Sequence, residues 1–133
     1  MIQAMPGHLR LGRRGEDLAA EFLRRAGMRI LERNWRPEKN ASLELDIVAQ
    51  EGDTLIFAEV KSRTLNISSS FTALDNFSAV KRKRLRKAVA MYLFQTQSWR
   101  KPCRFDLICV GFPGEGRETE KIRIDHYKNV LAE

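Results

Sequence analysis

The sequence predicts an α/β protein in which a mixed central β-sheet is flanked by helices, in the order α-β-β-β-α-β-β. Apolar residues recur at helical spacing in two stretches, 12–26 and 78–96. Apolar runs of strand length occupy the segments between and after these stretches, separated by turn-forming residues. Because strands both precede and follow the second helix, we expect one sheet with helices packed against it, without an internal repeat or a second domain.

The first helix is expected over residues 12–26 and ends before Gly27, a residue type that commonly terminates helices. Residues 1–11 are basic and lack a continuous apolar run, so we expect a flexible N-terminal segment without a secretory signal. Residues 12–133 then form a single domain, large enough for a hydrophobic core. Glu16 projects to the edge of the buried helix face. The buried stripe is expected to contain Leu18, Ala19, Phe22, Leu23 and Ala26.

Two apolar runs flank a Glu-Gly-Asp turn signal and predict a β-hairpin over residues 43–61. Side chains alternate between the two faces of a strand. In the first run, Glu44 and Asp46 therefore point away from the apolar face. In the second run, Glu59 and Lys61 share the face opposite the small aliphatic residues. The apolar faces are expected to contain Leu43, Leu45, Ile47 and Ala49 in the first run, and Ile56, Ala58 and Val60 in the second.

The remaining elements follow from similar patterns. Residues 62–77 show little periodicity and predict a long loop able to close over a substrate. The second helix is expected over residues 78–96, with Ser78 as its N-cap. The other expected segments are a strand over 28–35, a loop over 37–42, and two strands over 104–110 and 121–127 that are separated by a glycine-rich turn.

Two carboxylates and a lysine are expected close together on the hairpin, at Asp46, Glu59 and Lys61. Mg²⁺ prefers oxygen ligands and keeps several waters, so one or two carboxylates are enough to hold it. A neighbouring lysine can orient or deprotonate an attacking water, or stabilise developing negative charge. The alternative, an exposed hairpin edge with ion pairs, stays open from the spacing alone. Further candidate ligands are Glu16, Glu44 and the backbone carbonyl of Val60.

The chain carries a net charge of +7 and has a pI near 9.8, which favours a polyanionic partner. Six of the seven residues from Lys81 to Lys87 are cationic, near a helix start where the macrodipole disfavours positive charge. Contacts with phosphates would explain them and would give salt-sensitive, sequence-independent affinity. A solvated helix face is the alternative. The candidate nucleic-acid contacts are Arg63, Lys81, Lys83, Arg84 and Lys87.

Other kinds of site have less support. No segment approaches the roughly 18 apolar residues of a membrane span, and we expect a cytoplasmic protein. Cys103 and Cys109 do not form a CxxC motif and are expected to be reduced, partly buried thiols. The two histidines lie far apart without ligand-like neighbours, which disfavours a zinc site. Arg104 and Asp106 share a strand face and are interpreted as a structural ion pair. Neither a P-loop nor a nucleophile triad can be assembled.

Short motifs occur in a fixed order along the chain, among them Gly12-Arg13-Arg14-Gly15-Glu16, Asn34-Trp35-Arg36, Glu44-Leu45-Asp46-Ile47-Val48-Ala49, Phe57-Ala58-Glu59-Val60-Lys61-Ser62-Arg63 and Arg104-Phe105-Asp106. This order closely resembles the YraN family, small bacterial proteins with a restriction-endonuclease-like fold. The resemblance covers nearly the whole chain. That family is similar in turn to archaeal Holliday junction resolvases, which carry the PD-(D/E)xK nuclease site.

The resemblance implies a restriction-endonuclease-like core in which Glu16 is the helix acid, Asp46 the metal-binding aspartate, Glu59 the second acid and Lys61 the lysine of the site. It implies Mg²⁺ as the metal, with Mn²⁺ as a substitute. Resolvases work as dimers because two strands are cut symmetrically, and we extend the expectation of a homodimer to this chain. One departure is Leu43, which stands where the family usually has glycine.

The leading hypothesis is a Mg²⁺-dependent endonuclease that hydrolyses DNA phosphodiester bonds, with branched or otherwise structured DNA as the favoured substrate. The alternative is a non-catalytic nucleic-acid-binding module that keeps the fold and the basic surface. A third hypothesis, a protein-interaction adaptor, predicts an exposed apolar patch and no salt-dependent binding to DNA.

Overall fold

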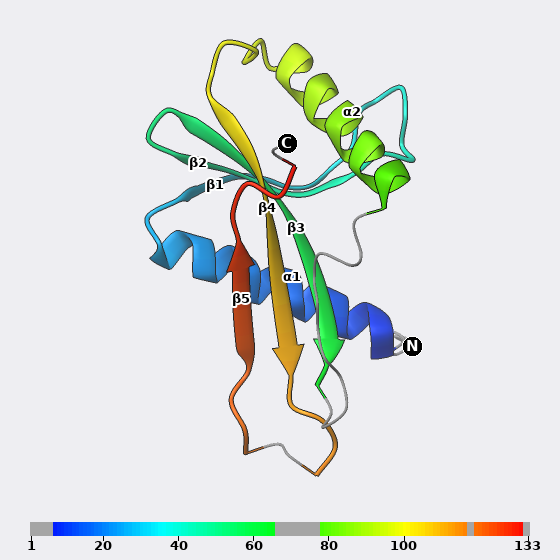
Figure 1. The fold of residues 1–133 in the computed structure, drawn as a ribbon, viewed down its shortest axis with the longest axis vertical. Coiled ribbons are helices and arrows are strands. Elements are labelled where there is room, and N and C mark those ends of the chain that lie inside the picture. The colour runs from blue at the N-terminus through cyan, green and yellow to red at the C-terminus, as the bar shows by residue number, and fades with distance from the viewer. Residues whose placement is uncertain (1–6, 66–77, 117–118, 132–133) are drawn as a thin grey trace, which may run out of the picture.

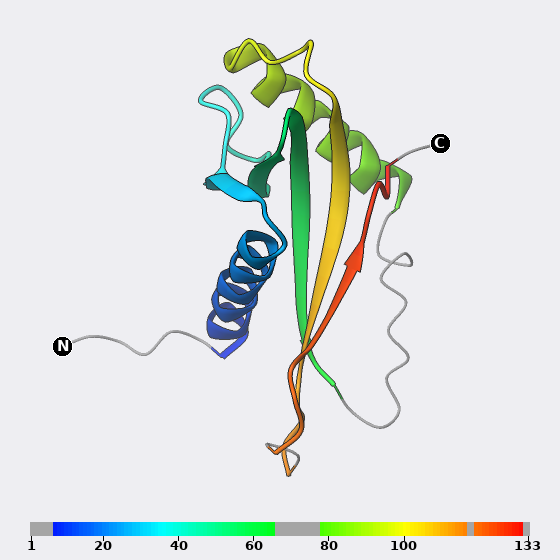
Figure 2. The same ribbon diagram turned by 90° about the vertical axis from the view of Figure 1, so that its left-hand side faces the viewer.

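The computed structural model describes residues 7–65, 78–116 and 119–131. A five-stranded sheet carries one helix on each face, which confirms the predicted fold class (Figures 1 and 2). The predicted order α-β-β-β-α-β-β is also confirmed. The elements are α1 (Gly7–Arg25), β1 (Arg29–Trp35), β2 (Leu45–Glu51), β3 (Thr54–Thr64), α2 (Ala79–Gln95), β4 (Cys103–Phe112) and β5 (Arg123–Tyr127).

The strands lie in the spatial order β1-β2-β3-β4-β5. The first three strands pair antiparallel, β3 pairs parallel with β4, and β4 pairs antiparallel with β5. A parallel pair requires a crossover connection, and α2 lies in the connection between β3 and β4. The long β3–β4 ladder therefore forms the centre of the sheet, with a helix above and below it.

Side chains of β3 are buried alternately on the two faces of the sheet. Phe57 packs into a core cluster with Leu85 of α2. Ile56 and Ala58 pack into a second cluster with Leu23 of α1. The predicted faces of the second hairpin strand are thus confirmed, and each large apolar side chain that is fully buried contributes about 1.5–3 kcal/mol.

The helix α1 begins at Gly7, so the prediction of a flexible segment is wrong for residues 7–11. Leu11 packs partly against the core beneath α1 and thereby extends the apolar stripe toward the N-terminus. The stripe also differs at its other end. Ala26 is exposed because the helix ends one residue earlier, whereas Ala20 is fully buried. The rest of the predicted N-terminal segment, residues 1–6, lies outside the described residues.

The strand β3 is longer than the hairpin pattern indicates. It continues through Ser62 and Arg63 to Thr64, so these residues do not begin the predicted loop. The cause is the parallel partner β4, which pairs with β3 as far as Phe112. The remainder of that loop, residues 66–77, lies outside the described residues.

The first hairpin strand does not keep one apolar face, and this prediction is wrong. Leu43 and Leu45 belong to the core cluster beneath α2, whereas Ile47 and Ala49 belong to the cluster beneath α1. Strict alternation holds only while a strand stays in a regular ladder. The ladder between β2 and β3 covers residues from Ile47 onward. Before Ile47 the alternation is broken, so Leu45 and Ile47 point to opposite faces of the sheet.

Both cysteines are free. Cys109 is buried within β4, and this burial raises the pKa of its thiol to about 12. Cys103 is exposed, so the expectation of a partly buried thiol is wrong for this residue. Its position as the first residue of β4, at the end of the ladder, explains the difference.

Gly15 marks a close approach of α1 to β3. A Cβ at this position would overlap Ser62 Oγ and lie 2.9 Å from Ser62 Cβ. Gly15→Ala is therefore expected to force the helix away from the sheet and to lower the free energy of unfolding by about 1–3 kcal/mol. Urea denaturation measures this change.

Gly12 provides the matched control, because a Cβ there meets nothing within 4 Å. Gly12→Ala is expected to stabilise the protein by up to about 1 kcal/mol, since alanine has the higher helix propensity. Equal unfolding free energies for the Gly12 and Gly15 variants would contradict the close packing at Gly15.

Candidate active site

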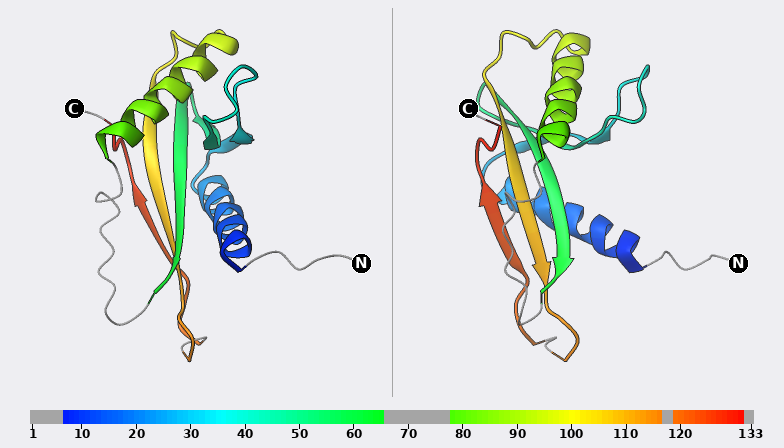
Figure 3. Two further views of the ribbon diagram at one scale, coloured as in Figure 1. Left: turned by 90° about the vertical axis from the view of Figure 1, so that its right-hand side faces the viewer. Right: turned by 45° about the vertical axis from the view of Figure 1, so that its right-hand side comes forward.

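The candidate site forms where β2 diverges from β3, beneath the crossing helix α2 (Figure 3). The paired residues end at Ile47 and Ala58, and the next residues, Asp46 and Glu59, line one cavity. In place of a backbone ladder bond, Asp46 Oδ2 accepts a hydrogen bond of 2.9 Å from the Val60 N–H. The end of the ladder thus brings together the two acids that the sequence predicted on this hairpin.

Three carboxylates meet at this point. Glu16 of α1, Glu44 and Asp46 each offer an oxygen, and these oxygens lie within 4.8 Å of one another. Carboxylate oxygens at such spacing suit Mg²⁺ or Mn²⁺. The structure therefore unites two predicted ligands, Glu16 and Asp46, with Glu44, a further candidate ligand in the sequence analysis. The other predicted ligand, Glu59, lines the same cavity but is not part of this group.

Two acids of this group, Asp46 and Glu16, have pKa values raised above those of ordinary carboxyl groups. Burial raises the pKa of Asp46 to about 7 against the hydrogen bond from Val60, and the nearby charges of Glu59, Glu16 and Glu44 add to the increase. Burial also raises the pKa of Glu16, although Asn34 and Arg33 oppose this effect. A divalent cation would relieve the repulsion among these carboxylates and would displace their protons.

Glu59 is nearly enclosed, with a side chain that is 13% exposed. Its Oε1 atom lies 3.0 Å from Lys81 Nζ and 3.6 Å from Lys61 Nζ. The Oε2 atom is buried and has no hydrogen-bond partner among the described residues. A buried acceptor without a partner is energetically unfavourable, so this oxygen fits an additional ligand such as a cation.

Two lysines from different elements share Glu59. Burial and the adjacent Lys81 lower the pKa of Lys61 despite the attraction of Glu59. For Lys81, burial lowers the pKa, but contacts with Lys61 and Glu59 outweigh it and raise the pKa above its ordinary value. Lys61 is therefore the lysine more readily deprotonated, as a general base must be, while Lys81 keeps its positive charge.

The cavity has a volume of about 360 Å³. One wall is acidic, and the N-terminal half of α2 forms the opposite wall. Ser78 caps this helix through a hydrogen bond of 3.1 Å from the Lys81 N–H, as predicted. Arg84 donates a hydrogen bond of 2.8 Å to the Ser42 carbonyl and so ties α2 to the segment that precedes Asp46.

The structure distributes the predicted nucleic-acid contacts over three places. Lys81 and Arg84 line the cavity itself. Lys83 and Lys87 are exposed on α2 outside it. Arg63 lies near the end of β3 and is half-buried. The first four therefore all lie on α2, and Arg63 does not line that cavity.

Sequence reasoning missed the residues that hold the acids in place. Asn34 adopts a positive φ of 53° and hydrogen-bonds the Glu16 side chain, and Arg33 Nη2 lies 3.9 Å from a Glu16 oxygen. Arg36 donates a hydrogen bond of 3.0 Å to Glu44. The available signal was the Asn34-Trp35-Arg36 motif, which spans the end of β1, a strand that carries none of the predicted acids.

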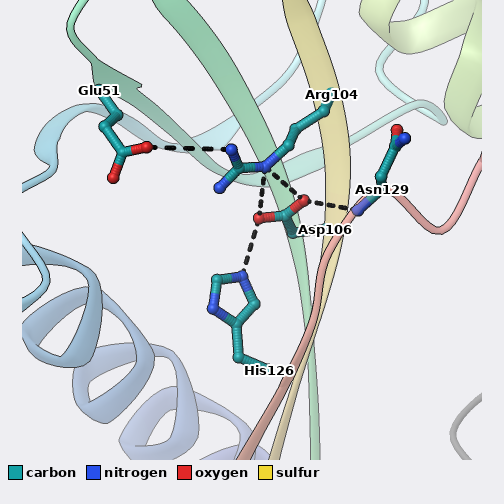
Figure 4. Close-up of polar contacts among 5 residues, drawn as sticks. All are labelled: Glu51, Arg104, Asp106, His126 and Asn129. Carbon is teal, nitrogen blue, oxygen red and sulfur yellow. Dashed lines mark hydrogen bonds and ion pairs between the residues drawn. The ribbon is translucent and has the colours of Figure 1, made fainter.

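A second polar cluster lies away from this cavity, on β4 and β5 (Figure 4). Asp106 is completely buried, and Arg104 Nε donates to it at 3.0 Å, which agrees with the predicted ion pair. The Asn129 N–H also donates at 3.0 Å, and His126 Nε2 lies 2.8 Å from Oδ2. The expectation that His126 has no ligand-like neighbour is therefore wrong, because strand pairing brings β5 to Asp106. One carboxylate and one histidine are too few for a zinc site.

The burial of Asp106 favours its neutral form, but its contacts outweigh this effect. The hydrogen bonds of His126, Arg104 and the Asn129 N–H hold the pKa of Asp106 below its ordinary value. The side chain is thus a buried anion that joins two strands to the segment following β5.

Comparison with known proteins places these features in a family. The model of "Uncharacterised protein family UPF0102" matches residues 15–110. A UPF0102 protein of Oleidesulfovibrio alaskensis is 43% identical over 120 residues, which are 90% of this chain and 56% of the relative. Relatives from Ectopseudomonas mendocina and Pelotomaculum thermopropionicum are 38% and 39% identical, and the alignments cover 96% and 91% of this chain and 98% and 94% of those proteins.

The fold and the cavity define an α/β protein with an acidic site beneath a basic helix. The chain belongs to the UPF0102 family, the YraN family that its motifs indicate. It spans little more than half the length of the O. alaskensis relative. Within the described parts of the chain, no helix combines the length and the apolar character needed to cross a membrane.

Proposed function

We propose that this protein is a Mg²⁺-dependent endonuclease that hydrolyses phosphodiester bonds of DNA, with branched or otherwise structured DNA as its favoured substrate. The observation that carries the proposal is the meeting of Glu16, Glu44 and Asp46 within 4.8 Å. Glu44 and Asp46 of this group line a cavity together with Glu59 and Lys81. The acids suit a cation and the basic helix suits a phosphate backbone, so the two halves of the cavity match a metal-assisted cleavage reaction.

The donor set fits a divalent cation. Asp46 with Glu16 and Glu44 would hold it, and the unpartnered Oε2 of Glu59 is a further oxygen on the same cavity. Bound Mg²⁺ supplies charge neutralisation at the phosphate and a more acidic water. The raised pKa of Asp46 and of Glu16 is consistent with a site adapted to bind positive charge.

The lysines have separate roles in this proposal. Lys61, whose pKa is lowered, accepts a proton from the attacking water in its neutral form. Lys81, whose positive charge is favoured, orients Glu59 and offers charge to a phosphate oxygen. Arg84, Lys83 and Lys87 bind the backbone of the nucleic acid on either side.

Lys61→Ala tests the proposal by separating cutting from binding. Labelled duplex, flap and four-way-junction DNA are incubated with wild type or variant in Mg²⁺, Mn²⁺ or EDTA. Wild type is expected to cut in either metal and not in EDTA. The variant should cut at least about 100-fold more slowly, as for the loss of a general base, with an unchanged Kd for DNA.

Lys121→Ala is the control, because this exposed lysine lies before β5 and does not line the cavity. It should cut at the wild-type rate. Cutting by wild type in EDTA, or full activity of the Lys61 variant, would contradict the proposed mechanism.

One observation favours the alternative, a non-catalytic nucleic-acid-binding module. The ion pair of 3.0 Å between Lys81 and Glu59 occupies one oxygen of a predicted metal ligand. In such a module the pair stays closed and the basic helix alone binds DNA. Salt-dependent binding of every DNA substrate, with no cutting in Mg²⁺ or Mn²⁺, would support this function over the endonuclease.

A further inference from the structure

The helix α2 carries a line of residues that leads away from the candidate active site. Val80, Arg84, Lys87, Met91 and Phe94 are separated by three or four positions and therefore lie along one side of the helix. Val80 and Arg84 line the cavity of the candidate site. The other three line a second cavity of about 390 Å³. The two cavities thus follow each other along the same side of α2.

The segment between β1 and β2 faces this line and forms the other wall. Glu38 and Lys39 line the second cavity, and Ser42 and Glu44 line the first. Figures 1 and 3 show this segment alongside α2, and the hydrogen bond from Arg84 to Ser42 fixes the two together between the cavities. We call the combined feature the α2 groove, defined by residues 38–44 and this side of α2.

The far end of the α2 groove carries an exposed aromatic pair. Phe94 is 76% exposed and Trp99 is 58% exposed. Their ring centroids are 6.5 Å apart and their planes differ by 32°, so the two exposed rings lie beside each other. Large aromatic side chains exposed in this way indicate an interaction surface or a ligand-binding site.

The charge around the aromatic pair indicates the chemistry of the occupant. Lys39 and Lys87 line the cavity beside Phe94, with Glu38 as its one acidic lining residue. Arg100 and Lys101 follow Trp99 and are both exposed. Cations interleaved with exposed aromatic rings are typical of proteins that bind single-stranded nucleic acid, because the rings stack on bases while the cations contact phosphates. An apolar protein partner would not need this excess of positive charge.

We propose that the α2 groove binds a single-stranded segment of the substrate, with bases stacked on Phe94 and Trp99 and phosphates bound by Lys39, Arg84 and Lys87. The inference rests on the proposed function for the position of the cut. The α2 groove extends about 20 Å along the helix from Lys81 to Phe94, at 1.5 Å per residue. An intact duplex hides its base faces, so the substrate is a nucleic acid with a single-stranded arm, such as a flap or a splayed junction.

The test measures binding in EDTA, where no cutting occurs. Fluorescence anisotropy gives the Kd for a labelled single strand, a flap and a blunt duplex with wild type, Phe94→Ala and Trp99→Ala. Each substitution is expected to weaken binding of the single strand and the flap by roughly 5- to 100-fold, the size of one lost base-stacking contact. The Kd for the blunt duplex should change less than about twofold.

Arg123→Ala is the control for a lost surface contact, because Arg123 is exposed on β5 and lines neither cavity. Its Kd values should match wild type. Circular dichroism spectra verify that the variants fold. Quenching of Trp fluorescence by the single strand, retained in Trp35→Phe and lost in Trp99→Phe, would locate the stacked base.

Unchanged Kd values for both aromatic variants would overturn the inference. A change in molar mass by light scattering on Phe94→Ala would also overturn it, because the aromatic pair would then bind a second copy of the chain. The cleavage assay is independent of this result. The aromatic variants could lose single-strand binding while wild type shows no metal-dependent cutting. That combination would refute the endonuclease and leave the α2 groove assignment intact.

Discussion

Asp46→Asn is expected to stabilise the metal-free protein at pH 8 by up to about 4 kcal/mol. Burial and neighbouring carboxylates raise the pKa of Asp46 from 3.8 to about 7 in the folded state. The folded protein therefore binds this proton more tightly than the unfolded chain, and its stability falls as pH rises between these values. Asparagine has no charge to lose, and its amide oxygen still accepts the hydrogen bond from Val60.

The sign of this effect depends on pH. Below pH 3.8 the carboxyl group is protonated in both states and the two proteins should have nearly equal stability. The difference should grow between pH 4 and pH 7 and be complete above that range. Urea denaturation in EDTA at pH 4, 6 and 8 measures it. An asparagine variant that is less stable than wild type at pH 8 would refute the repulsion among the clustered acids.

Asp106→Ala is expected to lower the free energy of unfolding by about 3–5 kcal/mol. The substitution removes a fully buried carboxylate and leaves Arg104 without its closest partner in the cluster. It also leaves the Asn129 N–H without its acceptor. Because the pKa of Asp106 is lowered in the folded state, its contribution is present above pH 3.8 and lost as pH falls through the folded value. The difference from wild type should therefore shrink in strong acid.

Asp125→Ala is the matched control on β5. Asp125 pairs with Arg123 at 2.8 Å, but the arginine side chain is 68% exposed. Exposed ion pairs contribute little, so this variant should lose less than about 1 kcal/mol. Chemical denaturation at neutral pH compares both variants. Similar losses for the two would contradict the special role of the buried anion.

The elements of the fold could be predicted because each one depends on local patterns. The helix face of Leu85, Ala88 and Tyr92 and the hairpin face of Ile56 and Ala58 appear in the sequence as simple periodicities, and the structure buries both. The errors occur where a partner decides the outcome. Pairing with β4 extends β3 to Thr64. Because the ladder between β2 and β3 stops at Ile47, Leu45 packs into the core beneath α2 and not with Ile47 beneath α1.

The candidate site divides in the same way. Sequence spacing identified Asp46, Glu59 and Lys61 because all three lie on one hairpin, and Glu16 because it projects from the edge of a helix face. The ion pair of Lys81 with Glu59 joins residues that are 22 positions apart, and His126 reaches Asp106 across a distance of 20 positions. No local pattern records such contacts, which arise only when α2 crosses the sheet and β5 pairs with β4.

The most direct test of the central claim, that the acidic cluster holds a divalent cation, is a titration with Mn²⁺ followed by electron paramagnetic resonance at pH 8. Wild type is expected to show one saturable site, and Asp46→Asn should lose it. Asp17→Asn should keep the site, because Asp17 is exposed on α1 and contributes no oxygen to the cluster. Absence of a saturable site in wild type, or its persistence in the Asp46 variant, would contradict the account.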